Sequence, residues 1–365
     1  MFYLLHSQCS KARFPLVAKT KMAPETTFIK ACYGRNDAHI PAWLMRQAGR
    51  YQQSYREIKE KVGFWGICTD PELIANVTLK AALDLNADAA IIFSDITLPS
   101  WAMGMDLEFA PGPRFAQPIR QLNDIDALEI YNPAEKVPFL LQGIKNTRAG
   151  LPQEKSLIGF IGAPLTMAAY MVEGKPDRQW RKFKALAYDD PKTLEALLEK
   201  LSLALIAHAK AQIAAGCDAI QLFDTSVSEI TYTHIHELGF NYAQKVISAL
   251  KGEGVPVIYF ARNVSQHYSH LSKLGADVLG VDWTTSIKEV RNAIGDDITL
   301  MGNLDPCMLY CSQSVIKKQV ENILEEARGL PGYIFNLGHG VLPETPPENV
   351  RFVIDTVHQY DRASA

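Results

Sequence analysis

Several features that would define a function at once are missing from this sequence. No uninterrupted apolar run approaches the roughly 18 residues that span a bilayer, so no membrane helix is predicted. A formal net charge of −3 argues against a general nucleic-acid or membrane-surface binder, since such proteins carry basic surfaces. The six cysteines in 365 residues form no disulfide framework, which predicts a reducing, cytoplasmic compartment.

Two ligand-binding motifs are also absent. No Gly-x-Gly-x-x-Gly follows the first apolar run, which removes the usual reason to expect a dinucleotide-binding open sheet. Only Cys307 and Cys311 are close together, and no histidine stands at ligand spacing beside them. We therefore predict no metal site.

The amino-terminal segment differs from the rest of the chain. Nothing before Glu25 is acidic, and four basic residues precede it. That composition looks like a transit segment, but Met22 could equally be the real start. We interpret residues 1–24 as a disordered extension or an upstream-start artefact, and 25–365 as one catalytic domain.

Eight short apolar runs alternate with helical patterns through the rest of the chain. Near-continuous apolarity is typical of strands buried on both faces of a parallel sheet. The clearest helix covers 191–215, where Asp190 and Pro191 form a start signal and Gly216 a stop. The pattern predicts a single (β/α)8 TIM barrel with its active site at the carboxyl ends of the strands. The predicted strands are 41–45, 89–95, 157–164, 219–224, 255–261, 278–283, 298–304 and 333–337.

A weak internal repeat supports this organisation. Asn86-Ala87-Asp88, Gly216-Cys217-Asp218 and Gly275-Ala276-Asp277 each close a predicted helix and begin a strand. A doubly wound open sheet is the alternative arrangement.

Polar residues at the predicted strand ends are the candidates for chemistry. Arg46 and Arg50 flank Gln47-Ala48-Gly49, and a coiled loop would bring both guanidiniums to one side. Arginine suits carboxylate recognition because its fork is bidentate. The competing interpretation is a structural pairing with Glu57 or Glu60.

Other strand ends supply a carboxylate, hydroxyls and an imidazole. Asp95 closes an apolar run, where it could bind a ligand or cap the next element. His339 lies between two glycines, which leave its ring accessible. The long connection before Asp124 would cover a flat ligand or form a hairpin that seals the barrel. We expect the remaining candidates on polar stretches to be surface histidines, namely His234, His236, His267 and His270.

Taken together, these motifs resemble the uroporphyrinogen decarboxylase family over nearly all of the chain from about residue 26. The matching segments are 45–51, 89–95, Gly162-Ala163-Pro164 with 170–174, 280–284, 302–306 and 336–340. The resemblance implies conversion of uroporphyrinogen III to coproporphyrinogen III by a homodimer in haem biosynthesis, with no metal or organic cofactor.

The resemblance also implies roles for particular residues. Arg46 through Arg50, with Gln47, Ala48 and Gly49 between them, would contact substrate carboxylates. Asp95 would face the pyrrole N–H groups, and Tyr170, Thr225 and His339 would surround the acetate arms. Asp95, Arg46 and Tyr170 are the predicted catalytic residues.

Three other functions compete with this one. A corrinoid-protein methyltransferase shares the barrel but needs a zinc-binding His-x-Cys, which the sequence lacks. A non-catalytic tetrapyrrole carrier is suggested by departures from the family pattern near the barrel mouth. A Schiff-base phosphosugar enzyme would want a lysine at a strand end, where Asp282-Trp283 stands instead. The departures are Lys80-Ala81, Leu165, Lys175-Pro176, Ser226-Val227 and Arg262-Asn263-Val264.

Overall fold

The computed structural model describes residues 25–35, 39–109 and 112–364, with side chains to residue 360. The interpretation of residues 1–24 therefore lies outside the described residues. In the part of the chain that is described, no helix combines the length and apolarity needed to cross a membrane.

Seven parallel strands form one sheet in the order β1-β4-β5-β6-β7-β8-β9, which follows the chain. Their side chains are buried on both faces, as the apolar runs predicted. A separate antiparallel pair, β2 (Leu107–Phe109) and β3 (Pro113–Phe115), lies in the long connection after β1. The sheet strands are β1 (Ala89–Ile91), β4 (Ser156–Gly162), β5 (Ala219–Asp224), β6 (Val257–Ala261), β7 (Val278–Gly280), β8 (Thr299–Leu304) and β9 (Tyr333–Leu337).

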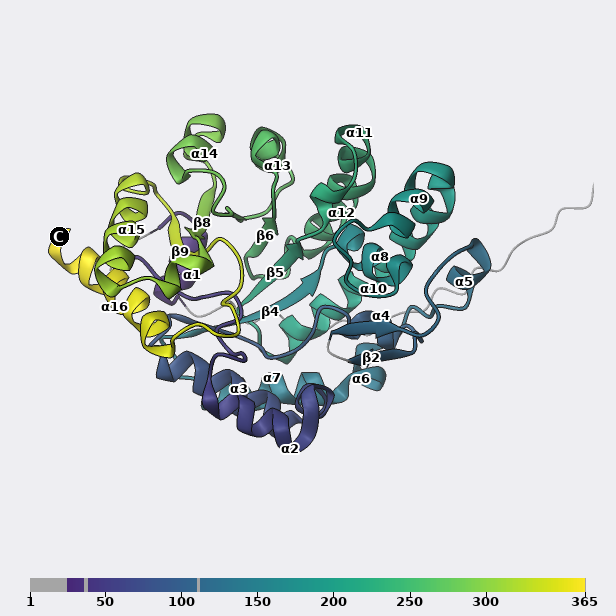
Figure 1. The fold of residues 1–365 in the computed structure, drawn as a ribbon, viewed down its shortest axis with the longest axis horizontal. Coiled ribbons are helices and arrows are strands. Elements are labelled where there is room, and N and C mark those ends of the chain that lie inside the picture. The colour runs from purple at the N-terminus through teal and green to yellow at the C-terminus, as the bar shows by residue number, and fades with distance from the viewer. Residues whose placement is uncertain (1–24, 36–38, 110–111, 365) are drawn as a thin grey trace, which may run out of the picture.

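Helices follow the sheet strands and lie around the curled sheet, with α2, α3 and α7 along one side and α11, α13 and α14 along the opposite side (Figure 1). The α-helices are α1 (Thr27–Cys32), α2 (Gln53–Thr69), α3 (Pro71–Asp84), α4 (Leu98–Ala102), α5 (Leu122–Asp126), α6 (Pro133–Lys136), α7 (Pro138–Gly150), α8 (Pro164–Glu173), α9 (Arg181–Asp189), α10 (Pro191–Ala215), α11 (Tyr232–His234), α12 (Asn241–Leu250), α13 (Tyr268–Leu271), α14 (Ile287–Ile294), α15 (Gln313–Glu326) and α16 (Pro347–Ser364). The 3₁₀-helices are η1 (Val227–Glu229), η3 (Ser265–His267) and η4 (Pro306–Tyr310), and η2 (Ile235–Phe240) is a π-helix.

Local signals in the sequence explain the helix bounds. The predicted helix over 191–215 matches α10, whose cap Asp190 accepts a hydrogen bond from the Thr193 amide. Asp70 caps α3 in the same way, through the amides of Glu72 and Leu73. Each cap satisfies amide groups that the first helical turn leaves unpaired.

The segment 41–45 is not a full strand, contrary to expectation. It forms a single parallel bridge between Ala42 and Phe335 of β9. Its pairing stops because the backbone turns at Leu44, whose amide donates to the Gln47 side chain. The expected strand 89–95 is also shorter, since β1 ends at Ile91.

The internal repeat has a clear structural role. Asp218 donates its amide to the Leu157 carbonyl, and its carboxylate accepts the Leu157 amide. Asp277 makes the same pair of bonds with Val257, and Asp88 makes it with Ala42. Each of the three aspartates thus joins the amino end of its own strand to the amino end of the neighbouring segment. The segment 41–45 therefore lies beside β1 in the position of a neighbouring strand.

Candidate active site

The loop that carries Arg46 is anchored by a buried side chain. The Gln47 amide group donates to the Ala89 carbonyl of β1 at 3.1 Å and accepts from the Leu44 amide at 3.2 Å. The Tyr51 hydroxyl donates to the Gln47 carbonyl at 2.6 Å. Gln47 is only 1% exposed, so its side chain holds the loop in place.

Arg46 adopts an unusual backbone conformation. Its φ of 59° lies in the left-handed region, which non-glycine residues seldom occupy. The loop after β9 supports this conformation, because the Val341 amide donates to the Met45 carbonyl at 2.9 Å. Backbone strain of this kind persists where the surroundings over-determine it, and it gathers at functional sites.

Asp95 lies four residues beyond β1, near Arg46. Its Oδ1 atom accepts the Thr97 amide at 2.8 Å and the Thr97 hydroxyl at 2.5 Å. Among the described residues, no hydrogen bond reaches Oδ2. Burial raises the pKa of Asp95, while the Thr97 hydrogen bonds and the Arg46 charge oppose that rise. Asp95 therefore combines a supported oxygen with one that can receive a ligand donor.

Tyr170 and His339 adjoin the same charges. Tyr170 lies on α8 with its ring edge-on to Trp180, and burial followed by the Asp95 charge raises its pKa. Burial lowers the pKa of His339 to about 4, with further contributions from Arg46 and Arg262. Its imidazole is consequently neutral at pH 7 and offers one donor and one acceptor.

Arg262, which belongs to one of the departures from the family pattern, adds a guanidinium that is not among the predicted site residues. It follows β6 directly, and its charge acts on both Tyr170 and His339. Its Nε atom is buried and has no hydrogen-bond partner within the described residues. A buried donor of this kind can bind an acceptor group of a ligand. Its position directly after a strand was the signal available in the sequence.

Arg50 and Thr225 have different surroundings. Arg50 is exposed, and neither it nor Arg46 forms an ion pair with a described carboxylate, so the alternative pairing with Glu57 or Glu60 is not observed. Ala48 and Gly49 are partly exposed beside it. Thr225 is partly buried just beyond β5.

The carboxylate of Asp224, at the end of β5, is bound by side chains of the protein itself. It is fully buried, and it accepts hydrogen bonds from the Thr166 and Tyr259 hydroxyls, each at 2.7 Å. Burial raises the pKa of its carboxyl to about 6. Both oxygens are thus engaged by protein groups.

The connection after β1 is a structural hairpin at its centre. Phe109 of β2 packs on Phe64 and Trp65 of α2, with ring centroids 4.7 and 5.7 Å apart. The Phe115 amide of β3 donates to the Gly174 carbonyl at the end of α8. The Phe109 ring of this connection therefore packs against other parts of the protein. That packing favours a hairpin that seals the barrel over a cover for a flat ligand.

The expectation for the surface histidines was wrong for His267. That residue is 3% exposed, because its ring packs against Phe240 and stacks on Tyr232. His236 and His270 are partly buried around it, and each has a buried Nε2 atom without a partner in the described part of the chain. Their polar sequence context concealed this packing.

The fold and these residues define a class: an α/β protein with a parallel sheet whose carboxyl edge gathers arginines, a carboxylate and a neutral imidazole. The family described as Uroporphyrinogen decarboxylase (URO-D) matches residues 23–360. The chain belongs to this family.

Named relatives agree with that membership, and a solved structure shares the fold. Uroporphyrinogen decarboxylase from Syntrophotalea carbinolica is 42% identical over 339 residues, covering 93% of this chain and 99% of the relative. The protein of that name from Geobacter sulfurreducens is 42% identical over 332 residues, covering 91% and 98%. A methyltransferase from Methanosarcina mazei superposes with a TM-score of 0.78 at 21% identity, covering 93% and 99%. This last similarity concerns the fold alone.

Proposed function

We propose that this chain converts uroporphyrinogen III to coproporphyrinogen III by removing the carboxyl groups of its four acetate arms, without metal or organic cofactor. Support comes from relatives named uroporphyrinogen decarboxylase, which match the chain over almost its whole length. The observation that carries the proposal is the Oδ2 atom of Asp95, which accepts no hydrogen bond from the described residues and lies near Arg46 and Tyr170. A polyanion with N–H groups at its centre fits that combination.

The reaction needs an electron sink, which a cofactor often supplies. A pyrrole can act as its own sink. Protonation of a ring carbon gives a cation delocalised onto nitrogen, and cleavage of the bond to the carboxylate then releases CO2. The electron pair left behind neutralises the ring and creates an exocyclic methylene. Protonation of that methylene, with loss of the ring-carbon proton, leaves a methyl group.

Asp95 would stabilise the cation through the pyrrole N–H groups. A fixed negative charge aimed at developing positive charge is a preorganised electrostatic effect, and losing one such group typically costs about 10² to 10³ in rate. The Thr97 hydrogen bonds keep the carboxylate in place and favour its ionised form. In this proposal Asp95 acts as a fixed charge and transfers no proton.

The other residues would position the arms. Arg46, Arg50 and Arg262 supply guanidiniums for carboxylates. His339 and Tyr170 offer neutral hydrogen-bonding groups next to them, and Thr225 adds a hydroxyl. Gln47, Ala48 and Gly49 contribute the loop that presents Arg46.

Three groups could deliver the proton to the ring carbon. An arginine guanidinium is a poor acid because it holds its proton throughout the physiological range. Arg46 therefore competes in this role with a water molecule and with a carboxyl group of the substrate itself.

We extend the proposal to the whole molecule. The bonds of Asp88 with Ala42 repeat those of Asp218 with Leu157 across two paired strands, so we infer that 41–45 completes an eight-stranded barrel. We also propose that 25–365 is one catalytic domain and that the protein is a homodimer. Five described cysteines are free thiols, which suits a reducing cytoplasm.

The test is anaerobic turnover of uroporphyrinogen III with a chelator present and products separated by carboxyl number. We expect coproporphyrinogen to form through seven-, six- and five-carboxyl intermediates. Asp95→Asn should slow each step by about 10² to 10³, whereas Asp126→Asn, at an exposed position on α5, should not. Tight binding without turnover in the wild type would instead support a tetrapyrrole carrier.

A further inference from the structure

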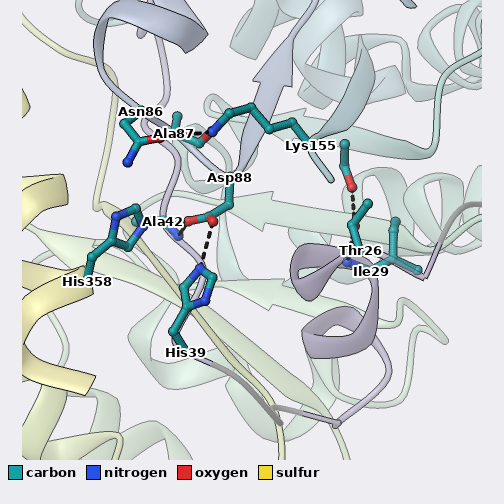
Figure 2. Close-up of polar contacts among 10 residues, drawn as sticks. Thr26, Ile29, His39, Ala42, Asn86, Ala87, Asp88, Lys155 and His358 are labelled. Atoms are coloured by element: carbon teal, nitrogen blue, oxygen red, sulfur yellow. Dashed lines mark hydrogen bonds and ion pairs between the residues drawn. The ribbon is translucent and has the colours of Figure 1, made fainter. Parts of the chain in front are cut away.

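A second cluster of ionisable groups lies at the amino ends of the strands, at the end of β1 opposite Asp95. Asp88 immediately precedes β1, His39 precedes the segment 41–45, and His358 lies on α16. Figure 2 shows the two rings approaching the Asp88 carboxylate from separate elements. The three residues are far apart in the sequence, so no spacing motif reveals them.

The two imidazoles address different oxygens of one carboxylate. His39 Nε2 lies 2.8 Å from Oδ1, and His358 Nε2 lies 2.8 Å from Oδ2. Although burial alone would raise it, hydrogen bonds from His358 and His39 hold the pKa of Asp88 well below its usual range. Asp88 and His358 are largely buried, with side-chain exposures of 13% and 14%, while His39 is 30% exposed.

The internal repeat shows what is unusual about Asp88. Asp218 forms an ion pair with Arg148 at 2.8 Å, and the charge of Lys251 acts on Asp277. Among the described residues, Asp88 has no lysine or arginine as an ion-pair partner and meets two imidazoles instead. The buried Asp88 carboxylate therefore lies between two side chains that can bind a metal ion, whereas Asp218 and Asp277 lie near cationic side chains.

We propose that His39, Asp88 and His358 bind a divalent transition-metal ion of the zinc class. Two imidazole nitrogens and one carboxylate oxygen are ligands that zinc accepts, with a fourth position for water. One ligand atom from each residue lies within 4.8 Å of the others. Tetrahedral bonds of about 2.0–2.2 Å place ligand atoms about 3.3 Å apart, so the two rings, which now contact different oxygens of Asp88, would shift to share one ion with the carboxylate.

Binding requires each ring to present an unprotonated Nε2, so its remaining proton moves to Nδ1. The Asp88 carboxylate keeps its bond from the Ala42 amide, at 2.7 Å to Oδ2, because an oxygen can coordinate and accept at once. The ion would join α16, β1 and the segment 41–45. It would therefore stabilise the fold without contacting the reacting groups.

The first experiment is a zinc titration of the chelator-stripped full chain, read by competition with a chromophoric chelator. We expect one reversible equivalent that His39→Gln and His358→Gln each remove. Glutamine keeps a donor for Asp88 but is a poor zinc ligand, so these variants should fold. His234→Ala is the matched control, because His234 is partly exposed and bonds Thr231 outside the cluster.

A second measurement separates a metal site from a hydrogen-bonded cluster. Cobalt(II) should give the d–d absorption of a tetrahedral site in the wild type and not in His358→Gln. Zinc should raise Tm by a few degrees in the wild type alone. Equal stoichiometry in wild type and both glutamine variants, or no binding at about 100 µM zinc, would overturn the proposal. Turnover should stay unchanged in these variants, so the result is independent of the proposed reaction.

Discussion

The Arg46 side chain lies against Gly340 so closely that a Cβ atom at position 340 would stand 2.4 Å from Cδ of Arg46. The glycine after His339 thus leaves room for the Arg46 side chain. The loop after β9 and the loop that carries Arg46 are almost 300 residues apart in the chain, and they can pack together because position 340 has no Cβ atom.

Gly340→Ala should therefore lower kcat/KM without unfolding the protein. The new methyl would push the guanidinium aside, and a misplacement of about 1 Å can cost about 10² in rate. Steady-state turnover of uroporphyrinogen III measures the loss, and thermal unfolding checks the fold.

A double-mutant cycle with Arg46→Lys tests the cause. If the methyl acts through the guanidinium, the two losses should be strongly non-additive. Additive losses would show that Gly340→Ala acts on some other part of the site.

The hydrogen bond from the Thr97 hydroxyl to Asp95 predicts a shift in the pH profile. That bond lowers the pKa of a carboxyl that burial raises, so Thr97→Val should raise the pKa of Asp95. Because the ionised form is the active one, the acid limb of log kcat/KM should move to higher pH. Thr97→Ser, which keeps the hydroxyl, should leave the limb in place. A uniform loss of rate with an unmoved limb would contradict the assigned role.

Arg262 is expected to affect substrate binding more than the chemical step. Its buried Nε has no hydrogen-bond partner among the described residues and can donate to a substrate carboxylate. A charge-assisted hydrogen bond contributes about 1.5 to 3 kcal/mol. Arg262→Leu should raise KM by about tenfold or more with a smaller change in kcat. Arg262→Lys restores the charge but not the fork, and should recover part of the affinity. An unchanged KM in Arg262→Leu would show that this residue does not bind the substrate.

Much of the fold could be predicted because its signals are local. Buried parallel strands leave apolar runs, and Asp190 with Pro191 and Gly216 defined α10 to the residue. The limits appeared where tertiary contacts override the pattern. The segment 41–45 has the apolarity of a strand, but its pairing ends where Gln47 captures the Leu44 amide.

The candidate site was predictable to the extent that its residues follow strands. Asp95, Arg46 and His339 come together because the carboxyl ends of parallel strands share one edge. The role of Gly340 could not be inferred, because it depends on where a side chain 294 positions earlier lies. The burial of His267 depends on rings from separate elements, which polarity along the chain does not encode.

His208 predicts how stability changes with pH. Its ring is buried in α10, where Nδ1 bonds the Tyr131 hydroxyl at 2.8 Å, and burial lowers its pKa to about 4. The unfolded chain, with a histidine pKa near 6.5, binds this proton first, so stability falls as pH drops from about 6.5 to about 4. This one group accounts for at most about 3 kcal/mol of that loss. Urea unfolding of His208→Gln, whose amide can still bond Tyr131, should show a shallower decline across this window. The control His234→Gln, at a partly exposed position, should keep the wild-type slope. Identical slopes for His208→Gln and wild type would mean that His208 titrates normally in the folded protein.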